Sequence, residues 1–347
     1  MRAALFEAPG QPLVIGEVEA PQPQPTDLLV QVKGCGICGS DLHLSALADR
    51  SSGMAPLTPG AIMGHEFCGE VVEVGAHAPG QWHEGDRVCA LPYISCGHCV
   101  DCVSGRGHRC REVVYSGMGN LGGGYADYVR VGGAEALALP DGVDFRAGAM
   151  VEPLAVGLHA VRLAELRPGD GVLIIGAGPI GLAVAHWCRF FGARHVVISD
   201  LAAGRLAKAA ALGATDGIDA STEDVVGRYK QIAGRRAEVV FDCVGVAGSQ
   251  QLAMDYAPAN GRLVIAGLCM QQDHYMPVKA ISKELSVQYV YMYERRDFEL
   301  ALEMLDRGRI DPGPMITDVV GFDAFSAAFE GLKTPSEHCK ILLDPQA

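Results

Sequence analysis

The sequence has no strongly basic segment, and this lack excludes several classes of partner. Its 347 residues include 28 Lys and Arg against 41 Asp and Glu, which gives a formal net charge of −13. Such a charge repels phosphate backbones and anionic lipid surfaces unless a local basic patch offsets it. We therefore expect neither a nucleic acid nor a membrane among the partners.

Long uninterrupted apolar runs and targeting segments are also missing. The longest apolar stretch, Val172 to Cys188, is short for a membrane span and is interrupted by Gly176, Gly178, Pro179 and Gly181. The N-terminus has no basic segment followed by a long apolar core, so we expect no signal peptide and a cytoplasmic protein. No segment is biased enough in composition to indicate disorder.

The length and the composition favour two sheet-rich domains. The chain is longer than the range in which a single core keeps growing, and its 44 Gly and 19 Pro suit short strands and tight turns. Up to about residue 150, short apolar runs broken by Gly, Pro and Asp predict an antiparallel β domain. After Val151, apolar strands alternate with Ala-rich helical stretches, which predicts βαβ units and a parallel sheet. These strands are expected at Val172 to Ile175, Val196 to Ser199, Val239 to Asp242 and Leu263 to Ala266.

The end of the chain changes character again. The parallel pattern is expected to end near Ile281, Phe298 to Leu305 has helical spacing, and Lys340 to Leu343 is a closing apolar stretch. These changes place domain boundaries near residues 153 and 290, with Glu152-Pro153 as a hinge. The tail can then return to the first domain.

A glycine pattern predicts a dinucleotide site. The pattern G-x-G-x-x-G at Gly176, Gly178 and Gly181 follows an apolar strand and opens an apolar helix. The first glycine permits a tight turn, the second lets the backbone approach a pyrophosphate, and the third lets helix and strand pack closely. The first turn of that helix, with Pro179 and Ile180, offers N–H donors and a positive dipole to the phosphates.

Asp200 ends the second apolar strand of this region. A carboxylate there accepts hydrogen bonds from the adenosine ribose hydroxyls and repels a 2′-phosphate, which favours NAD over NADP. Arg205 lies nearby and offers the alternative of a phosphate contact.

Four closely spaced cysteines predict a metal site. They follow the spacing C-x2-C-x2-C-x7-C, at Cys96, Cys99, Cys102 and Cys110. Four thiolates that converge on one zinc ion leave no open position, so such a site is structural. An iron–sulfur cluster is the competing occupant. We expect His98 and His108 in the same segment to be surface residues.

A second set of metal-binding residue types is dispersed along the chain. Cys38 lies in a G-I-C-G-S-D-L-H segment, His65 and Glu66 are adjacent, and Glu152 precedes a proline. Sulfur, imidazole and carboxylate together suit zinc. Three protein ligands and a water make an open, Lewis-acidic site, although spacing alone does not bring such distant residues together.

Together, these motifs resemble the zinc-containing medium-chain dehydrogenases, over nearly the whole chain and in the family's order. The resemblance implies an α/β chain. A GroES-like β catalytic domain would span residues 1–153 and 290–347, and a Rossmann coenzyme domain with a doubly wound parallel sheet would span 154–289. It further implies a catalytic and a structural zinc ion in each chain, NAD as the cofactor, and a homotetramer or homodimer.

The resemblance also assigns candidate zinc ligands. Cys38, His65 and Glu66 match catalytic ligands, and Glu152 stands where liver-type alcohol dehydrogenases place a cysteine. A glutamate there is similar to the polyol, butanediol and threonine dehydrogenase branch. Whether Glu66 or Glu152 binds zinc directly stays open.

The implied reaction is hydride transfer between a secondary alcohol and nicotinamide, in which zinc lowers the pKa of the alcohol. Ser40 and His43 match the family's proton relay. Polyol or L-threonine dehydrogenases of the same branch are alternatives. A zinc-stabilised binding protein is the alternative from another class, and quinone or enoyl reductases of the superfamily differ in working without zinc.

The expected substrate follows from one departure from the family pattern. Sorbitol dehydrogenases carry Phe-Arg-Tyr in a segment that resembles Tyr291 to Tyr293, so that Met292 replaces the arginine. A thioether donates no hydrogen bonds to hydroxyls but packs well against apolar groups. Tyr93 and Met118 are expected to extend the apolar wall of the substrate pocket that Met292 begins. We therefore expect the substrate to be an apolar or aromatic secondary alcohol, or a short diol.

Overall fold

The computed structural model describes residues 1–334 and 337–347, and the chain divides into two compact units. Unit 1 comprises Met1–Glu152 and Tyr293–Ala347, and unit 2 comprises Pro153–Met292. The chain therefore leaves unit 1 once and returns to it once. The expected boundaries, after residues 153 and 289, lie one and three residues from these crossings.

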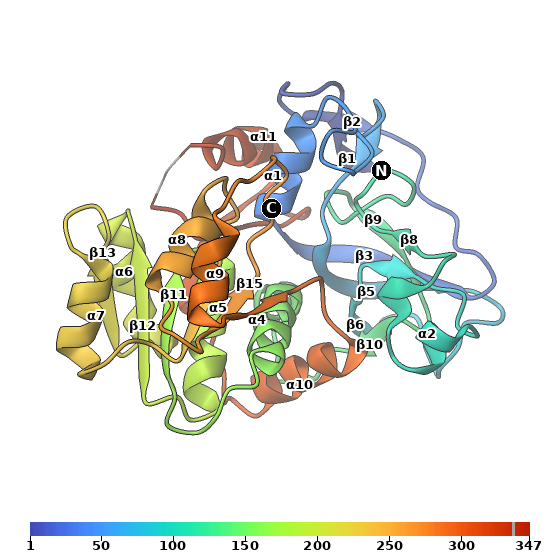
Figure 1. The fold of residues 1–347 in the computed structure, drawn as a ribbon. Coiled ribbons are helices and arrows are strands. Elements are labelled where there is room, and N and C mark those ends of the chain that lie inside the picture. Colours follow the sequence, from blue (N-terminus) through green and yellow to red (C-terminus); the bar gives the residue numbers. More distant parts are fainter. Residues whose placement is uncertain (335–336) are drawn as a thin grey trace. The chain divides into compact units, whose positions relative to one another are not determined.

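Unit 1 is built around β-sheets that the C-terminal tail completes (Figure 1). Its largest sheet has the order β10-β6-β5-β3-β18-β17, and β9 also pairs with β3. Strand β18, from the tail, pairs antiparallel with the end of β3. The strands of unit 1 are β1 (Arg2–Phe6), β2 (Val14–Glu17), β3 (Asp27–Gly36), β4 (Ala61–Ile62), β5 (Glu66–Val74), β6 (Arg87–Ala90), β7 (Tyr93–Ile94), β8 (Val114–Tyr115), β9 (Tyr128–Gly132), β10 (Ala136–Ala138), β17 (Ile316–Val320) and β18 (Lys340–Leu343). Its helices are α1 (Gly39–Ala46), α2 (Val100–Val103), α3 (Phe145–Ala149), α10 (Arg295–Asp306) and α11 (Phe322–Gly331), with short 3₁₀ turns at Gly107–Arg109 and Gly313–Met315.

The core of unit 1 fixes the end of β3, where the candidate ligand Cys38 follows. Val30 and Val32 of β3 are buried together with Tyr125. Two phenylalanines of α11 pack on the Tyr125 ring, with centroid distances of 4.8 Å to Phe325 and 6.3 Å to Phe329. Burial of each large apolar side chain stabilises the fold by about 1.5–3 kcal/mol, so the tail helix anchors the region from which the site is built.

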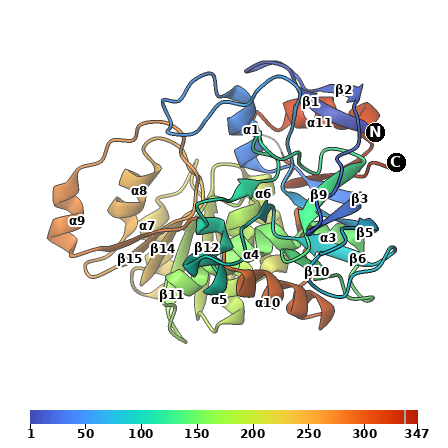
Figure 2. The same cartoon turned by 90° about the vertical axis from the view of Figure 1, so that its right-hand side faces the viewer.

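Unit 2 contains one parallel sheet of six strands, in the order β13-β12-β11-β14-β15-β16. The order reverses at β11, which pairs with both β12 and β14, as in a doubly wound fold. Helices surround the sheet (Figures 1 and 2). The strands are β11 (Gly171–Ile175), β12 (His195–Asp200), β13 (Asp216–Asp219), β14 (Val239–Asp242), β15 (Arg262–Ile265) and β16 (Ser286–Tyr289). The helices are α4 (Val151–Leu163), whose first two residues belong to unit 1, α5 (Pro179–Phe190), α6 (Ala203–Ala209), α7 (Val225–Ala233), α8 (Ser249–Tyr256) and α9 (Pro277–Lys283), with a 3₁₀ turn at Ala210–Leu212.

Two details differ from the sequence-based expectation. The parallel pattern does not end near Ile281, because β16 pairs in parallel with β15, and β13 is a further strand. Both are edge strands with polar or exposed residues, so they lack the apolar run that marks the central strands. The expected hinge at Glu152-Pro153 coincides with the passage of the chain from unit 1 to unit 2. It lies within the first turn of α4, where the backbone N–H that proline lacks would have no partner within the helix.

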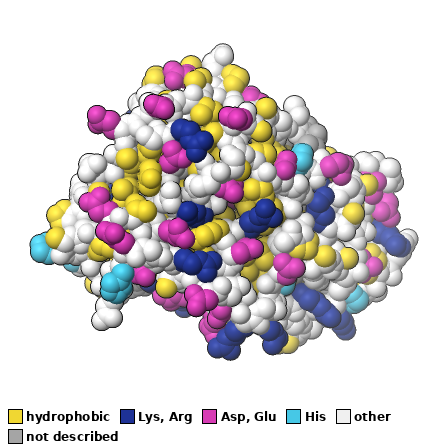
Figure 3. Space-filling model, turned by 180° about the vertical axis from the view of Figure 1, so that it is seen from behind, with side chains coloured by type: hydrophobic (Ala, Val, Ile, Leu, Met, Phe, Trp, Pro, Cys, Tyr) yellow, Lys and Arg dark blue, Asp and Glu magenta, His cyan; other side chains and the backbone are white. Residues whose placement is uncertain are grey.

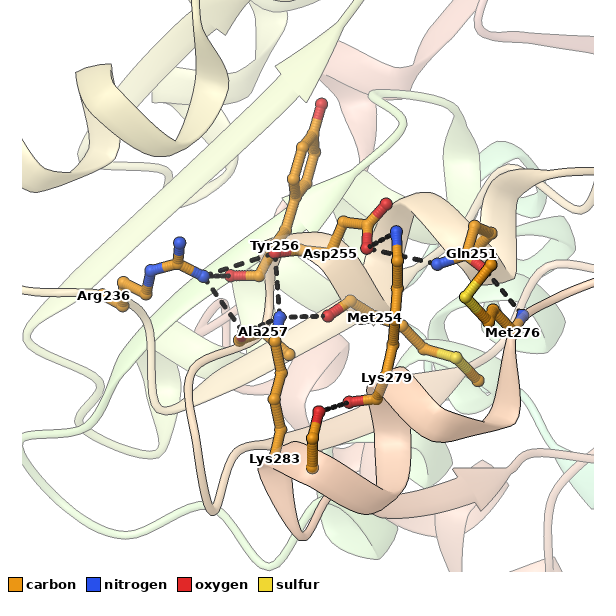
Figure 4. A network of polar contacts seen from close by, with 10 residues as sticks. Arg236, Gln251, Met254, Asp255, Tyr256, Ala257, Met276, Lys279 and Lys283 are labelled. Atoms are coloured by element: carbon orange, nitrogen blue, oxygen red, sulfur yellow. Dashed lines mark hydrogen bonds and ion pairs between the residues drawn. The ribbon is translucent and has the colours of Figure 1, made fainter.

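A polar network holds α8 and α9 together (Figure 4). Lys283 donates to the carbonyl oxygens of Met254, Asp255 and Ala257 at 2.7–3.1 Å, and Arg236 donates to those of Asp255, Tyr256 and Ala257 at 3.1–3.3 Å. Two cations thus bind the free carbonyl groups at the C-terminal end of α8, where the helix dipole favours positive charge.

The surface carries charges of both signs. Figure 3 shows one face on which acidic and basic side chains are interspersed. Over the described residues, no helix combines the length and apolar character that crossing a membrane requires.

Candidate active site and metal centres

The end of β3 and the start of β5 bring together three candidate ligands. Gly36 of β3 pairs with Glu66 of β5, so the segment that follows β3 lies beside the residue that precedes β5. The ligand atoms of Cys38, His65 and Glu66 all lie within 4.8 Å of one another. Antiparallel pairing of β3 with β5 therefore brings together candidate ligands that lie far apart in the sequence.

A buried aspartate orients the His65 ring. His65 Nδ1 lies 3.2 Å from Asp41 Oδ1, and its Nε2 lies 3.4 Å from the hydroxyl of Ser40. The other oxygen of Asp41 accepts hydrogen bonds from Tyr125 at 2.5 Å and from the backbone N–H of Cys38 at 3.3 Å. A carboxylate at Nδ1 fixes the tautomer that presents Nε2 to a metal ion.

The charges in this cluster suit a cation. Burial lowers the pKa of His65, but Asp41 and Cys38 raise it, and the net pKa is well above the ordinary value. Burial raises the pKa of Asp41, but His65 and the hydrogen bonds from His65 and Tyr125 lower it, and the net pKa is below the ordinary value. The donor set and its negative potential therefore fit a zinc ion.

Glu66 is held by a lysine from the far end of the chain. Lys340 Nζ lies 2.6 Å from each carboxylate oxygen of Glu66 and donates to the carbonyl oxygen of Ile37 at 2.9 Å. The Glu66 and Lys340 side chains are 0% and 1% exposed. All three ammonium hydrogens have acceptors, so the carboxylate is fixed in place and part of its charge is neutralised.

Glu152 is a neighbour of this cluster and lies outside the group of three ligand atoms. It is buried in the first turn of α4. Burial raises its pKa to about 7, while the charge of His65, a hydrogen bond with Tyr293 and the charge of Lys340 lower it and the charge of Glu66 raises it. Of the two glutamates left open by the sequence, Glu66 shares the ligand cluster with Cys38 and His65.

The four cysteines converge in the lobe around α2. Their four sulfur atoms lie within 4.8 Å of one another, with Cys102 Sγ at 3.4 Å from Cys99 and at 3.8 Å from Cys96. Tetrahedral zinc with bonds of about 2.3 Å places its sulfurs about 3.8 Å apart. An iron–sulfur cluster distributes four thiolates over several irons and spreads them more widely, so this spacing fits a single zinc ion.

Local hydrogen bonds prepare this lobe for a metal. Backbone N–H groups of His98 and Cys99 lower the pKa of Cys96 to about 6, which favours its thiolate. His98 is exposed as expected, but His108 is buried. The expectation of a surface position for His108 is wrong, because the 3₁₀ turn is held by Tyr115 of β8, which donates to the His108 carbonyl oxygen at 2.5 Å, and the His108 side chain is buried.

The glycine turn has the geometry that the motif predicts. Gly176 adopts φ +98°, and a Cβ on Gly181 would lie 1.8 Å from the carbonyl oxygen of Gly176, so both positions require glycine. Gly178 caps α5 and faces open space. Pro179 and Ile180 form the half-buried first turn of α5, so the turn and helix end can approach a pyrophosphate.

Asp200 holds this turn in place. Its two carboxylate oxygens accept hydrogen bonds from the backbone N–H groups of Ala177 at 2.7 Å and Ala202 at 2.8 Å. Arg205 lies half-buried in the first turn of α6, close in sequence to that carboxylate. The carboxylate thus joins the end of β12 to the glycine turn.

Two family models match the two parts of the chain. Residues 24–141 match the alcohol dehydrogenase GroES-like domain, and residues 179–307 match the zinc-binding dehydrogenase domain. The chain belongs to the zinc-containing medium-chain dehydrogenases. As a zinc alcohol dehydrogenase-type oxidoreductase, it combines a GroES-like and a Rossmann-like domain.

Relatives in this family act on different alcohols. L-idonate 5-dehydrogenase from Vitis vinifera is 36% identical over 298 residues, which cover 84% of this chain and 80% of that protein. The 2R,3R-butanediol dehydrogenase from Bacillus subtilis has a TM-score of 0.83 at 30% identity, with 99% of each chain covered. A structure from Sinorhizobium meliloti 1021, described as a zinc-binding dehydrogenase bound to NADP, has a TM-score of 0.86 at 34% identity, with 99% of each chain covered.

The four residues expected to line the substrate pocket of this dehydrogenase belong to different elements: two lie in unit 1 and two at the end of unit 2. Tyr93 is buried in the four-cysteine lobe, with its ring 6.4 Å from that of Tyr115. Met118 packs against the core of unit 1. Tyr291 is 53% exposed, and Met292 adopts the left-handed φ of +53° at the end of unit 2. A shared role for these four in substrate binding stays a prediction.

Sequence reasoning missed three residues of the site. Asp41 lies three residues after Cys38, which caps α1, and an acidic residue at this position is a sequence signal of a helix start. Lys340 is the first residue of β18, whose other residues are apolar. A lysine in such a buried strand indicates an acidic partner. Tyr293 is fully buried, and its pKa is raised by burial and then by the charge of Glu152 and a hydrogen bond with it.

Proposed function

We propose that this chain is a zinc-dependent, NAD(H)-linked dehydrogenase that interconverts a secondary alcohol or short diol and the corresponding ketone. The convergence of Cys38, His65 and Glu66, with Asp41 orienting the imidazole, carries the proposal. This arrangement provides three protein ligands of the types that zinc prefers and leaves a position for substrate.

Two zinc ions per chain are proposed. Zinc held by Cys38, His65 and Glu66 would act as a Lewis acid toward the alcohol oxygen and make its proton easier to remove. The four cysteines form a closed set, so the ion that they hold would stabilise the lobe without contacting substrate.

Ser40 and His43 are proposed to carry the alcohol proton away. The Ser40 hydroxyl lies 3.4 Å from His65 Nε2, the nitrogen that points into the ligand cluster. His43 follows three positions later on α1, a spacing that places two side chains on the same face of a helix. Burial lowers the pKa of His43, so a neutral imidazole is available as a proton acceptor near neutral pH.

The proposed cofactor is NAD, with Gly176, Gly178 and Gly181 beside its pyrophosphate. Asp200 supports this preference because its carboxylate lies at the end of β12, where it would accept hydrogen bonds from ribose hydroxyls and repel a 2′-phosphate. The NADP-bound relative and the nearby Arg205 make NADP the second candidate.

The proposed substrate class rests on Met292, which replaces a hydrogen-bonding arginine with a thioether. Each methylene buried in an apolar pocket contributes about 0.8 kcal/mol, or roughly a fourfold gain. We expect kcat/KM to rise along a series of lengthening 2-alkanols until the pocket is full. If sorbitol, xylitol or threonine exceeds every such alcohol by about tenfold, the chain is instead a polyol or threonine dehydrogenase.

A homodimer or homotetramer in the cytoplasm is also proposed. The edge strand β16 and the neighbouring helix α9 expose Val278, Ile281 and Tyr289, at 56%, 72% and 54%. An uncharged edge strand with apolar neighbours favours pairing with another chain. Light scattering coupled to size-exclusion chromatography tests this proposal, and a monomer at micromolar concentration contradicts it.

The function as a whole is tested with a panel of alcohols, NAD and NADP, with NADH or NADPH absorbance as the readout. Metal analysis of the same sample tests for two zinc ions per chain. A zinc-stabilised binding protein would show no turnover and no NAD-induced shift of the melting temperature.

A further inference from the structure

Cys96 belongs to two groups of metal-binding side chains. One is the set of four cysteines. In the other, the ligand atoms of Cys96, His98 and Glu112 lie within 4.8 Å of one another. Thiolate, imidazole and carboxylate are the donor types of the candidate catalytic centre, and together they suit zinc. One sulfur is therefore shared between a closed set of four thiolates and an open set of three mixed donors.

The outer site, made of Cys96, His98 and Glu112, is oriented by local hydrogen bonds. His98 Nδ1 lies 2.8 Å from the carbonyl oxygen of Cys96. A carbonyl oxygen only accepts, so Nδ1 carries the hydrogen, and a neutral ring then leaves Nε2 free to bind a metal ion. The backbone N–H of Glu112 donates to Cys110 Sγ at 3.3 Å, which ties this residue to the four sulfurs.

The outer site is more exposed than the four-cysteine set. His98 and Glu112 are exposed, whereas Cys110 is buried and the other three cysteines are partly buried. Four thiolates leave no open position on a zinc ion, so the ion enters or leaves such a set only by exchange of ligands. Exposed ligands that share one sulfur with the set are placed to bind the ion during that exchange.

We propose that Cys96, His98 and Glu112 form a loading site through which zinc enters and leaves the four-cysteine lobe. Cys96 keeps its bond to the ion during entry, while the other three thiolates replace the imidazole, the carboxylate and a water molecule. The thiol protons displaced by the new bonds pass to solvent. This role goes beyond the proposed function, because it concerns exchange of the structural ion and not turnover.

The test measures exchange of bound zinc for cadmium in the zinc-loaded full chain, with the ultraviolet absorbance of cadmium–thiolate bonds as the readout. His98→Ala combined with Glu112→Gln removes two outer ligands and keeps all four cysteines. This double variant should exchange the ion at least about tenfold more slowly than the wild type, which corresponds to a barrier higher by about 1.4 kcal/mol. The candidate catalytic centre has one thiolate, Cys38, and its smaller signal should be the same in both proteins.

The dependence on cadmium concentration adds a second readout. In the wild type, the exchange rate should level off as cadmium rises, because exchange passes through an ion bound at the outer site. In the double variant, the rate should rise in proportion to cadmium over the same range. A wild-type rate that never levels off contradicts a bound intermediate.

The matched control is His83→Ala combined with Glu84→Gln. These residues are an exposed histidine and glutamate of unit 1, outside the candidate metal groups of the described residues. The control should exchange zinc at the wild-type rate. The double variant of the outer site should keep the zinc content and the melting temperature of the wild type, because its ligands lie outside the closed set. An unchanged exchange rate, an equal slowing in the control, or a loss of zinc or stability overturns the loading site.

Discussion

Replacing Lys340 by methionine probes the charge balance of the candidate active site. Lys340 contributes three hydrogen bonds, two to Glu66 at 2.6 Å and one to the Ile37 carbonyl oxygen at 2.9 Å. Methionine has a similar length but no charge, so Glu66 would be left ionised at a position with 0% exposure. Breaking a buried ion pair by removing one partner costs about 3–5 kcal/mol.

The assay is urea unfolding of zinc-free protein, followed by intrinsic fluorescence. We expect Lys340→Met to lower the free energy of unfolding by about 3–5 kcal/mol. In a Glu66→Gln background, where no carboxylate needs a partner, the same substitution should cost little or stabilise the protein. With zinc bound, the ion compensates part of the Glu66 charge, so the loss should be smaller than in zinc-free protein.

Two results would refute this reasoning. One is a loss below about 1 kcal/mol in zinc-free protein, which is typical of an exposed ion pair. The other is an equal loss with and without the Glu66 carboxylate, which would mean that lysine contributes through packing alone.

Four further substitutions separate the roles of the two metal sites and the cofactor site. Cys38→Ser should abolish turnover while NAD binding and the melting temperature stay near wild type; global unfolding would point to a core role. His65→Ala should also abolish turnover but lower the melting temperature, because it leaves the buried Asp41 without its partner. Cys99→Ser should release one zinc ion per chain and lower the melting temperature, and an unchanged zinc content would contradict the structural assignment. Asp200→Ser should shift the NAD to NADP ratio of kcat/KM by at least about tenfold, or about 1.4 kcal/mol. The ratio is the readout because the substitution also removes hydrogen bonds from the glycine turn; an unchanged ratio would mean that another residue binds the ribose.

Local patterns in the sequence predicted much of the fold. The central strands β11, β12 and β14 lie where continuous apolar runs indicated buried parallel strands, and α5 begins at the glycine turn. The edge strands β13 and β16 were not predicted because exposure on one side removes the apolar run. Register and strand order, which bring the tail strand β18 next to β3, depend on contacts across the whole chain.

In the candidate site, too, the residues close together in the sequence could be predicted, and contacts between distant residues could not. The four cysteines lie within fifteen consecutive residues, so their spacing sufficed to predict a shared metal site. Lys340 and Glu66 are separated by 274 positions, and no local pattern marks their ion pair. The place of Tyr93 beside the substrate stays a prediction, because its ring contact with Tyr115, at 6.4 Å, does not say which groups a substrate would meet.

The central claim is that zinc held by Cys38, His65 and Glu66 supports NAD-linked oxidation of a secondary alcohol. The most direct measurement is the initial rate of NADH formation from 2-butanol and 2,3-butanediol, with the purified chain as isolated, after chelation and after zinc is restored. We predict that the rate falls by at least about a hundredfold on chelation and that zinc restores it. An unchanged rate in protein shown to be free of zinc, or no NADH from either alcohol at two zinc ions per chain, would contradict the account.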